Sequence, residues 1–193
     1  MKDYYMNNVL LHNFLQELNS ISRMAVIENA FTTEKMINIY SHLLKYRWNE
    51  VGKKVTATKE MNMVLKCCEL FKLKNEALID YTYIENGDIT TVFIPHYTMV
   101  AYIKGVLSVT QGMMNPLKLH IEVSQRKAEI WIQFFFTGQV NFKEIVEKAD
   151  YLDNGQDYES FSEATKRWQE TFKEDSFKIA IQENQLEICF VCR

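Results

Sequence analysis

One histidine, His12, has the type and the setting of a residue that could carry out phosphoryl chemistry. Apolar residues recur through the N-terminal segment with the spacing of one buried helix face, at Tyr4, Leu11, Phe14, Leu18, Ile21 and Ala25. His12 follows Leu11 directly, so its side chain is turned roughly 100° away from that face. A neutral imidazole on a rigid, exposed helix face can attack phosphorus as a nucleophile. The pattern therefore makes His12 the leading candidate for chemistry in this chain.

Polar residues accompany His12 on the outer side of this helix. Asn8 and Gln16 lie about one turn before and after His12, Arg23 lies about three turns after it, and Asn13 is the next residue in the chain. We expect Asn8, Asn13, Gln16 and Arg23 to line the surface on which a partner protein docks. The alternative is that His12 is an ordinary surface histidine without a chemical role.

The other histidines and the cysteines offer weaker candidates. We expect His42 on a helix surface, His96 at the opening of a helix and His120 on the polar face of a strand, and no pair has metal-ligand spacing. Cys189 and Cys192 are three residues apart in a predicted strand, so they point to opposite faces and cannot chelate one ion together. The sequence therefore predicts no metal site.

Length and composition indicate an ordinary globular protein. The chain has 193 residues, of which 47% are hydrophobic and 24% charged, and a formal net charge of −3. This balance offers no basic surface for nucleic acid or anionic lipid. No apolar run approaches the ~20 residues of a membrane span, no signal-peptide pattern opens the chain, and four cysteines suit a reducing compartment. We expect a cytoplasmic protein.

Apolar periodicity predicts a helical hairpin at the N-terminus. Helices are predicted over about 3–29 and 32–52, with capping chemistry at Thr32 for the second helix. The connection is short, so the two helices run antiparallel. A lone hairpin cannot bury both its faces, and we therefore expect it to pair with a second copy in a four-helix bundle.

The remaining sequence mixes helices and strands. A third helix is predicted from Thr56 or Thr58 to about Lys74, and later helices over 96–109, 141–153 and 158–173. Strands are predicted over 79–85, 89–94, 117–124, 129–136, 177–182 and 186–192, with Asn86-Gly87 as a hairpin turn between the first two. We expect an α+β fold, with residues 1–53 as the hairpin and 54–193 as an α/β sandwich whose core holds the aromatic run of Trp131 and 134–136.

Several stretches resemble the dimerisation and ATPase modules of bacterial sensor histidine kinases, above all the LytS/YesM-like group. The phosphoacceptor helix of that group carries Asn-Pro-His-Phe-Leu-Phe-Asn-x-Leu-Asn-Ser-Ile, and residues 10–21 here read Leu-Leu-His-Asn-Phe-Leu-Gln-Glu-Leu-Asn-Ser-Ile. The similarity continues over 34–37, 41–46, 55–56 and 69–74, and recurs at Ile94-Pro95. The resemblance implies a dimerising hairpin joined to a histidine-kinase-ATPase-like sandwich, with His12 as the phosphoacceptor.

The positions with which these kinases bind ATP are changed here. The helix after Ile-Pro carries Glu and Asn in the family, and that Asn ties the phosphates to Mg²⁺; the matching residues are Lys104 and Gly105, which supply no oxygen ligand. The family's Asp-x-Gly, whose Asp accepts the adenine amino group, is matched by Phe136-Thr137-Gly138. The glycine-rich lid corresponds to about 150–160, where Gly155 stands among acidic residues. We expect a degenerate site that binds no nucleotide, and no cofactor besides Mg²⁺ on a partner response regulator.

The plan is also similar to that of the sporulation initiation phosphotransferase of bacilli, a dimer that passes phosphoryl groups between response-regulator aspartates. The two resemblances together predict a homodimeric two-component phosphotransferase that relays phosphoryl groups through His12. The alternative is a non-catalytic pseudokinase that binds a response regulator or a true sensor kinase. An active ATP-dependent kinase is the third possibility, disfavoured because Asn13 stands where many histidine kinases carry an acid that orients the imidazole.

Overall fold

The chain folds into two compact units. The computed structural model describes residues 2–49, 52–75, 79–110, 115–151, 161–172 and 174–192. Contacts divide the chain into Met1–Asn49 and Glu50–Arg193, whereas the sequence places the boundary after residue 53. Within the described ranges, no helix combines the length and the apolar character that crossing a membrane requires.

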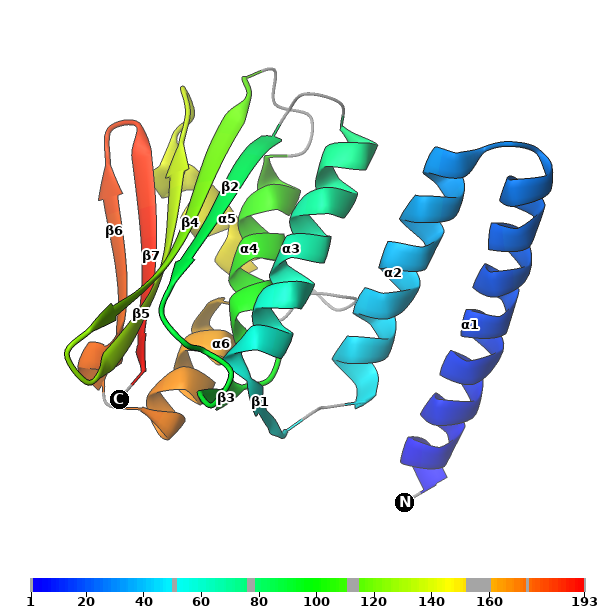
Figure 1. Cartoon of the computed structure of the whole chain (residues 1–193), viewed down its shortest axis with the longest axis horizontal. Helices are drawn as coiled ribbons and strands as arrows, with labels where there is room; N and C mark the ends of the chain where they lie inside the picture. The colour runs from blue at the N-terminus through cyan, green and yellow to red at the C-terminus, as the bar shows by residue number, and fades with distance from the viewer. Residues whose placement is uncertain are drawn as a thin grey trace. The chain divides into compact units, whose positions relative to one another are not determined.

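The first unit is a hairpin of α1 (Lys2–Ile27) and α2 (Phe31–Asn49) (Figure 1). Asn29 ends α1 in the left-handed conformation, with φ 57°, and the N–H of Ala30 donates to the carbonyl of Ala25 at 2.7 Å. This is a common way to satisfy the last carbonyls of a helix. The N–H of Glu34 donates to the Ala30 carbonyl at 3.0 Å. Helix α2 therefore begins before Thr32, and the predicted cap at that threonine is wrong.

One face of α1 packs on α2. Ser22 and Ala25 are buried, and the Ser22 hydroxyl donates to Asn38 Oδ1 at 3.2 Å. Phe14 and Ile21, which the sequence assigns to the same buried face, are 49% and 52% exposed. Residues three apart in this pattern, such as Leu11 and Phe14, lie about 60° apart around the helix. A single neighbouring helix, α2, therefore covers one row of these residues and leaves the other row exposed.

The second unit is an α/β sandwich built on one mixed sheet (Figure 1). Within the described residues the strands lie in the order β2 (Ile79–Asn86), β4 (Leu117–Arg126), β5 (Glu129–Thr137), β7 (Gln185–Cys192) and β6 (Phe177–Gln182). Strand β2 pairs in parallel with β4, and every other neighbouring pair is antiparallel. The four predicted strands over 117–124, 129–136, 177–182 and 186–192 are present, and they form the antiparallel hairpins β4–β5 and β6–β7.

The predicted hairpin at Asn86-Gly87 is wrong. The chain continues from β2 to β3 (Phe93–Pro95), which pairs antiparallel with β1 (Lys54–Thr56) in a separate small sheet. After β2, Asp88 Oδ1 accepts the N–H of Thr90 at 2.9 Å, and Ile89 is fully buried. This side-chain turn leads the chain away from β2. Strand β2 instead pairs in parallel with β4, and the connection between these two strands contains helix α4.

Four helices cover one face of the sheet among the described residues: α3 (Ala57–Lys74), α4 (Thr98–Val109), α5 (Phe142–Tyr151) and α6 (Phe161–Thr171), and a 3₁₀ turn (Glu174–Ser176) precedes β6 (Figure 1). Helix α4 is central, because most of its residues are buried and it packs against α3, α5 and α6. Of the two threonines predicted to start α3, Thr56 is the N-cap, since its Oγ1 accepts the N–H of Lys59 at 3.3 Å.

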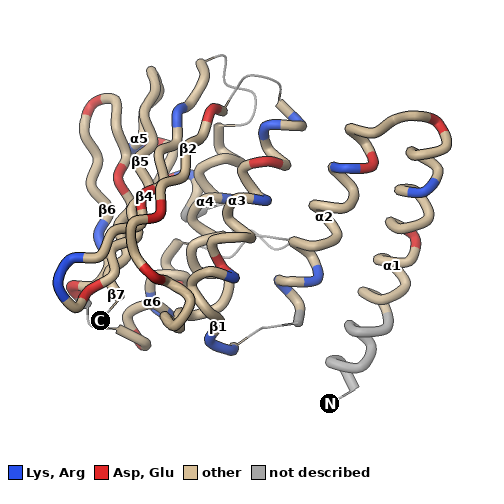
Figure 2. The backbone as a smooth tube through the Cα atoms, viewed as in Figure 1, with Lys and Arg blue, Asp and Glu red and all other residues tan. Residues whose placement is uncertain are grey.

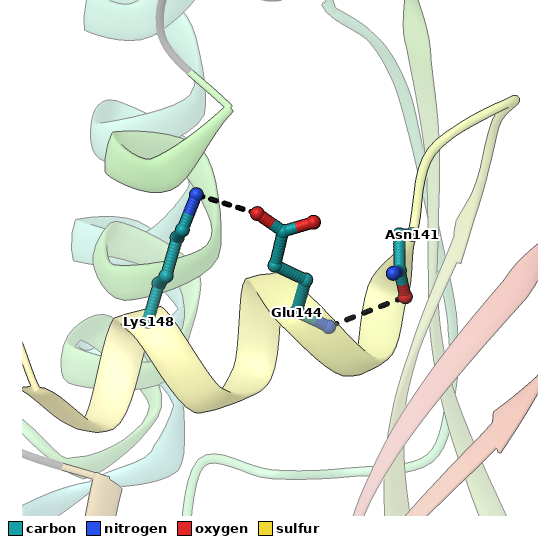
Figure 3. Close-up of polar contacts among 3 residues, drawn as sticks. All are labelled: Asn141, Glu144 and Lys148. Atoms are coloured by element: carbon teal, nitrogen blue, oxygen red, sulfur yellow. Dashed lines mark hydrogen bonds and ion pairs between the residues drawn. The ribbon is translucent and has the colours of Figure 1, made fainter.

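Helix α5 is fixed by its own polar residues (Figure 3). Asn141 Oδ1 accepts the N–H of Glu144 at 3.3 Å, which satisfies one of the first N–H groups of the helix. Lys148 Nζ lies 2.6 Å from Glu144 Oε1, one turn away. These contacts set the start of the helix that carries Ala149 toward α4.

The two faces of the sheet differ in the burial of their aromatic residues. Phe134 and Phe136 are fully buried on the helix-covered face, as predicted for the core. Trp131 and Phe135 alternate with them and lie half-exposed on the other face, so the expectation that this whole aromatic run fills the core is wrong. The indole of Trp168 is fully buried, and its ring centroid lies 4.6 Å from that of Phe172.

Candidate functional site

His12 lies on an exposed face of α1, and its ring forms a hydrogen bond with Gln16. The side-chain Nε2 of Gln16 lies 3.1 Å from His12 Nε2. Side chains on a helix lean toward its N-terminus, so a residue four positions later reaches back over the earlier one. Both side chains are exposed. A nucleophilic ring nitrogen at this position is therefore within reach of another protein.

The predicted docking residues spread along several turns of α1. At 100° per residue, Gln16 lies about 40° and Arg23 about 20° around the helix from His12, with Arg23 about 16 Å further along the axis. Asn13 is exposed but lies about 100° around the helix from His12. The side chain of Asn8 lies outside the described residues. Between residues 10 and 27 the charged residues are Glu17 and Arg23, so this part of α1 carries few charges (Figure 2).

A stripe of exposed apolar side chains runs along the other side of α1. It consists of Leu10, Phe14, Ile21 and Met24, each about half exposed or more. Helical spacing places these residues about 120–180° around α1 from His12. A protein that covers the stripe therefore leaves His12 accessible. Uncovered apolar residues in a row mark a contact surface more often than isolated ones do.

Gly105, which the resemblance to sensor kinases sets against their Mg²⁺-binding Asn, is closely packed. A Cβ built on Gly105 would lie 2.6 Å from Phe161 Cε1 and 3.4 Å from Ala149 Cβ. The Tyr102 hydroxyl donates to the carbonyl of Phe161 at 3.1 Å and also contacts Thr165 Oγ1. The rings of Tyr102 and Phe161 have centroids 4.4 Å apart. Helix α6 is thus packed against the face of α4 that carries Tyr102 and Gly105.

The other nucleotide positions also lack suitable groups in the described residues. Phe136, at the place of the adenine-binding Asp, is fully buried and carries no carboxylate. Gly138 lies in the turn after β5, where its N–H donates to the Asn184 carbonyl at 3.2 Å. Lys104 is half-buried beside the Gly105 position. Residues 152–160, with Gly155 of the predicted lid, lie outside the described part.

Sequence reasoning missed one buried carboxylate, Glu60. It is fully buried on α3, and its two oxygens accept the N–H groups of Tyr97 at 2.9 Å and Val100 at 3.1 Å. Tyr97 is left-handed, with φ 63°, just before α4. The carboxylate thereby stabilises the start of the central helix. The signal was present: Glu60 shares the helix face of Val64 and Phe71, where apolar residues dominate.

The other candidates from the sequence are structural. His120 Nδ1 lies 2.7 Å from Thr82 Oγ1, and its ring stacks on Phe135. His96 is buried and donates its backbone N–H to the Lys53 carbonyl at 3.1 Å. His42 is exposed on α2. In the part of the chain that the structure describes, no three His, Cys, Asp or Glu side chains converge on a possible metal position.

The four cysteines are buried free thiols. Cys189 and Cys192 occupy β7 positions of opposite parity, which confirms that they point to opposite faces of the sheet. Burial raises the pKa of the Cys67 thiol to about 11 and that of Cys192 to about 12. Protonated, enclosed thiols are poor nucleophiles and poor metal ligands.

Comparison with known proteins gives structural likenesses at low identity. No protein-family model and no curated protein matches the chain. The catalytic domain of the histidine kinase ThkA is 14% identical, with a TM-score of 0.48, over 72% of this chain and 95% of that one. A structure described as a bacterial phosphotransferase is 9% identical, with a TM-score of 0.43, over 96% and 90%. ThkA in complex with the response regulator TrrA is 13% identical, with a TM-score of 0.46, over 99% and 58%. At such scores these likenesses assign no residue a role.

Proposed function

We propose that this protein is a two-component phosphotransferase that relays phosphoryl groups to and from response-regulator aspartates through His12. The observation that carries the proposal is the position of His12 itself. It is exposed on α1, in the register of the LytS/YesM-like phosphoacceptor motif, and on the side of the helix away from the apolar stripe. Phosphoryl transfer from an acyl phosphate asks little of the acceptor beyond exposure and in-line geometry, because the regulator's Mg²⁺ stabilises the transferred group.

The phosphoryl group comes from another protein rather than from ATP. The packing of Phe161 on Gly105 supports this part of the proposal, because it fills the space that a phosphate and its Mg²⁺ need. The absence of a carboxylate at Phe136 supports it independently, since adenine recognition in the family depends on one. The second unit then acts as a scaffold and a docking surface.

The working form of the protein is a homodimer. The stripe of Leu10, Phe14, Ile21 and Met24 supports this, because a two-helix hairpin alone leaves these side chains in water. Pairing of two stripes would form a four-helix bundle with two His12 faces on its outside. Arg23 lies on the same face as His12 and would attract the acidic site of a receiver domain.

Incubation with a phosphorylated response regulator of the same organism tests the proposal. Label that is stable in base but labile in acid should appear on the wild-type protein and be absent from His12→Ala. Failure of every cognate regulator to label the wild type would contradict phosphotransfer. Regulator binding without label would instead favour the non-catalytic pseudokinase, which binds a regulator or a kinase and transfers nothing.

A further inference from the structure

Gln16 and His12 form a polar pair whose atoms restrict the chemistry of the imidazole. The atom of Gln16 nearest the ring is the amide nitrogen Nε2, 3.1 Å from His12 Nε2. An amide NH₂ group donates hydrogen bonds and accepts none. With the amide nitrogen of Gln16 facing the ring, His12 Nε2 accepts the hydrogen bond, and in the neutral ring the proton then lies on Nδ1.

The tautomer decides which nitrogen can attack phosphorus. A neutral imidazole has one lone pair in the ring plane, on the nitrogen that carries no proton. With the proton on Nδ1, that lone pair is on Nε2, which is also the nitrogen farther from the helix backbone. Asn13, which follows His12 in the chain, lies about 100° around α1. Within the described residues, the hydrogen-bond partner of the His12 imidazole is the side chain of Gln16.

We propose that Gln16 is a positioning residue that keeps His12 in the Nδ1–H tautomer and so directs phosphoryl transfer to Nε2. This inference rests on the phosphotransfer function proposed for His12. During transfer the Nε2 lone pair forms the N–P bond, while the P–O bond to the regulator's aspartate breaks and the carboxylate leaves with its electron pair. Nδ1 keeps its proton throughout. The amide N–H that held Nε2 becomes available to donate to a phosphoryl oxygen.

The tautomer of His12 can be measured without any phosphoryl donor. Protein labelled with ¹⁵N-histidine gives long-range ¹H–¹⁵N spectra in which the two tautomers differ, at a pH above about 7.5, where free imidazole is neutral. The His12 signals are assigned by their loss in His12→Ala. We expect the Nδ1–H pattern in the wild type and a mixture of the two tautomers in Gln16→Ala. The ratio of tautomers should change about twofold, which is the effect of a typical side-chain pair four residues apart on a helix surface.

Two variants sharpen the test. Gln16→Glu is nearly isosteric but replaces the donor by an acceptor, so it should turn the ring to the Nε2–H tautomer. Asn19→Ala, an exposed change on the same helix, should leave the wild-type spectrum unchanged. An Nε2–H pattern in the wild type, or no difference between wild type and Gln16→Glu, would overturn the inference.

A second arm links the tautomer to transfer and separates the two proposals. Treatment with the small phosphoryl donor phosphoramidate, followed by ³¹P and ¹⁵N spectra, should place the phosphoryl group on Nε2 in the wild type and slow this reaction in Gln16→Glu. Labelling at equal rates in both proteins would overturn the role of Gln16 while phosphotransfer through His12 stands. An Nδ1–H tautomer controlled by Gln16, with no label from any phosphorylated regulator, would instead contradict the proposed function alone.

Discussion

The ring of Phe161 lies so close to Gly105 that even a methyl group there would meet Phe161 Cε1 at 2.6 Å. Helix α6 follows the undescribed residues 152–160 and is held on α4 by the Tyr102 hydroxyl, which donates to the Phe161 carbonyl at 3.1 Å. In the sensor kinases that this sequence resembles, the Gly105 position carries an oxygen ligand for Mg²⁺. Here it is a contact between two helices.

Restoring the family's residue at this position should therefore damage the fold without creating a nucleotide site. Alanine in place of glycine inside a helix normally stabilises by up to about 1 kcal/mol. Gly105→Ala should instead destabilise by about 1–3 kcal/mol because it overpacks the contact, and Gly105→Asn by more. Urea unfolding measures the loss, and calorimetry with MgATP should detect no binding to Gly105→Asn.

The double variant with Phe161→Leu isolates the contact. The cost of Gly105→Ala should fall by more than about 0.5 kcal/mol in the Phe161→Leu background, because the clashing ring edge is gone. Equal costs in both backgrounds would show that Phe161 is not what closes this position.

Loss of the buried Glu60 carboxylate should destabilise the second unit. Glu60→Ala leaves the N–H groups of Tyr97 and Val100 without their acceptor, which should cost on the order of 2–4 kcal/mol. Glu60→Gln keeps one acceptor oxygen and should cost less. Asn62→Ala, an exposed change on the same helix, is the control for urea unfolding. If Glu60→Ala and Asn62→Ala unfold at the same urea concentration, the carboxylate does not stabilise α4.

Charge on the apolar stripe should separate the proposed dimer. Phe14→Glu or Ile21→Glu would place a carboxylate between the two copies, and sedimentation equilibrium should show monomers. Val26→Glu is the matched control, because Val26 is 47% exposed yet lies about 120° around α1 from Phe14 and about 140° from Ile21, outside the stripe. A wild type that is already monomeric, or a Val26→Glu variant that dissociates equally, would count against this interface.

The buried thiol of Cys67 should make stability fall at alkaline pH. Its pKa rises from an ordinary value of 9.0 to about 11 because burial disfavours the thiolate. Between these values the unfolded chain has lost the proton that the native protein still holds, so the free energy of unfolding decreases as pH rises. Below pH 9.0 the contribution is fully present. Urea unfolding from pH 8 to 11 should therefore give a flatter decline for Cys67→Ala than for wild type, and parallel curves would contradict the shift.

Local signals in the sequence predicted most elements of the fold. The apolar periodicity of α1 and α3, the Thr56 cap and the hairpins β4–β5 and β6–β7 all depend on residues close together in the chain. The Asn86-Gly87 hairpin was wrong because β2 pairs with β4, a strand more than thirty residues later, and local turn chemistry carries no information on such a partner. The exposure of Phe14 and Ile21 depends likewise on which helices are present to cover them.

The candidate site was predictable in part. The exposed position of His12 followed from its spacing relative to Leu11. The loss of nucleotide binding, inferred from Gly105 and Phe136, stays a prediction. The contact of Phe161 with Gly105 joins residues on different helices, and no local pattern contains it. The hydrogen bond between Gln16 and His12 could not be predicted from their shared helix face alone, because it also depends on the direction in which helix side chains lean.

The most direct test of the central claim compares two phosphoryl sources on three proteins. Wild type, His12→Ala and His42→Ala, in which an exposed histidine of α2 is removed as a control, are each incubated with a phosphorylated cognate receiver domain or with labelled MgATP. We predict acid-labile label on wild type and His42→Ala from the receiver, none on His12→Ala, and none on any protein from MgATP. Label on His12 from MgATP, or label from the receiver that survives the His12→Ala substitution, would contradict the account.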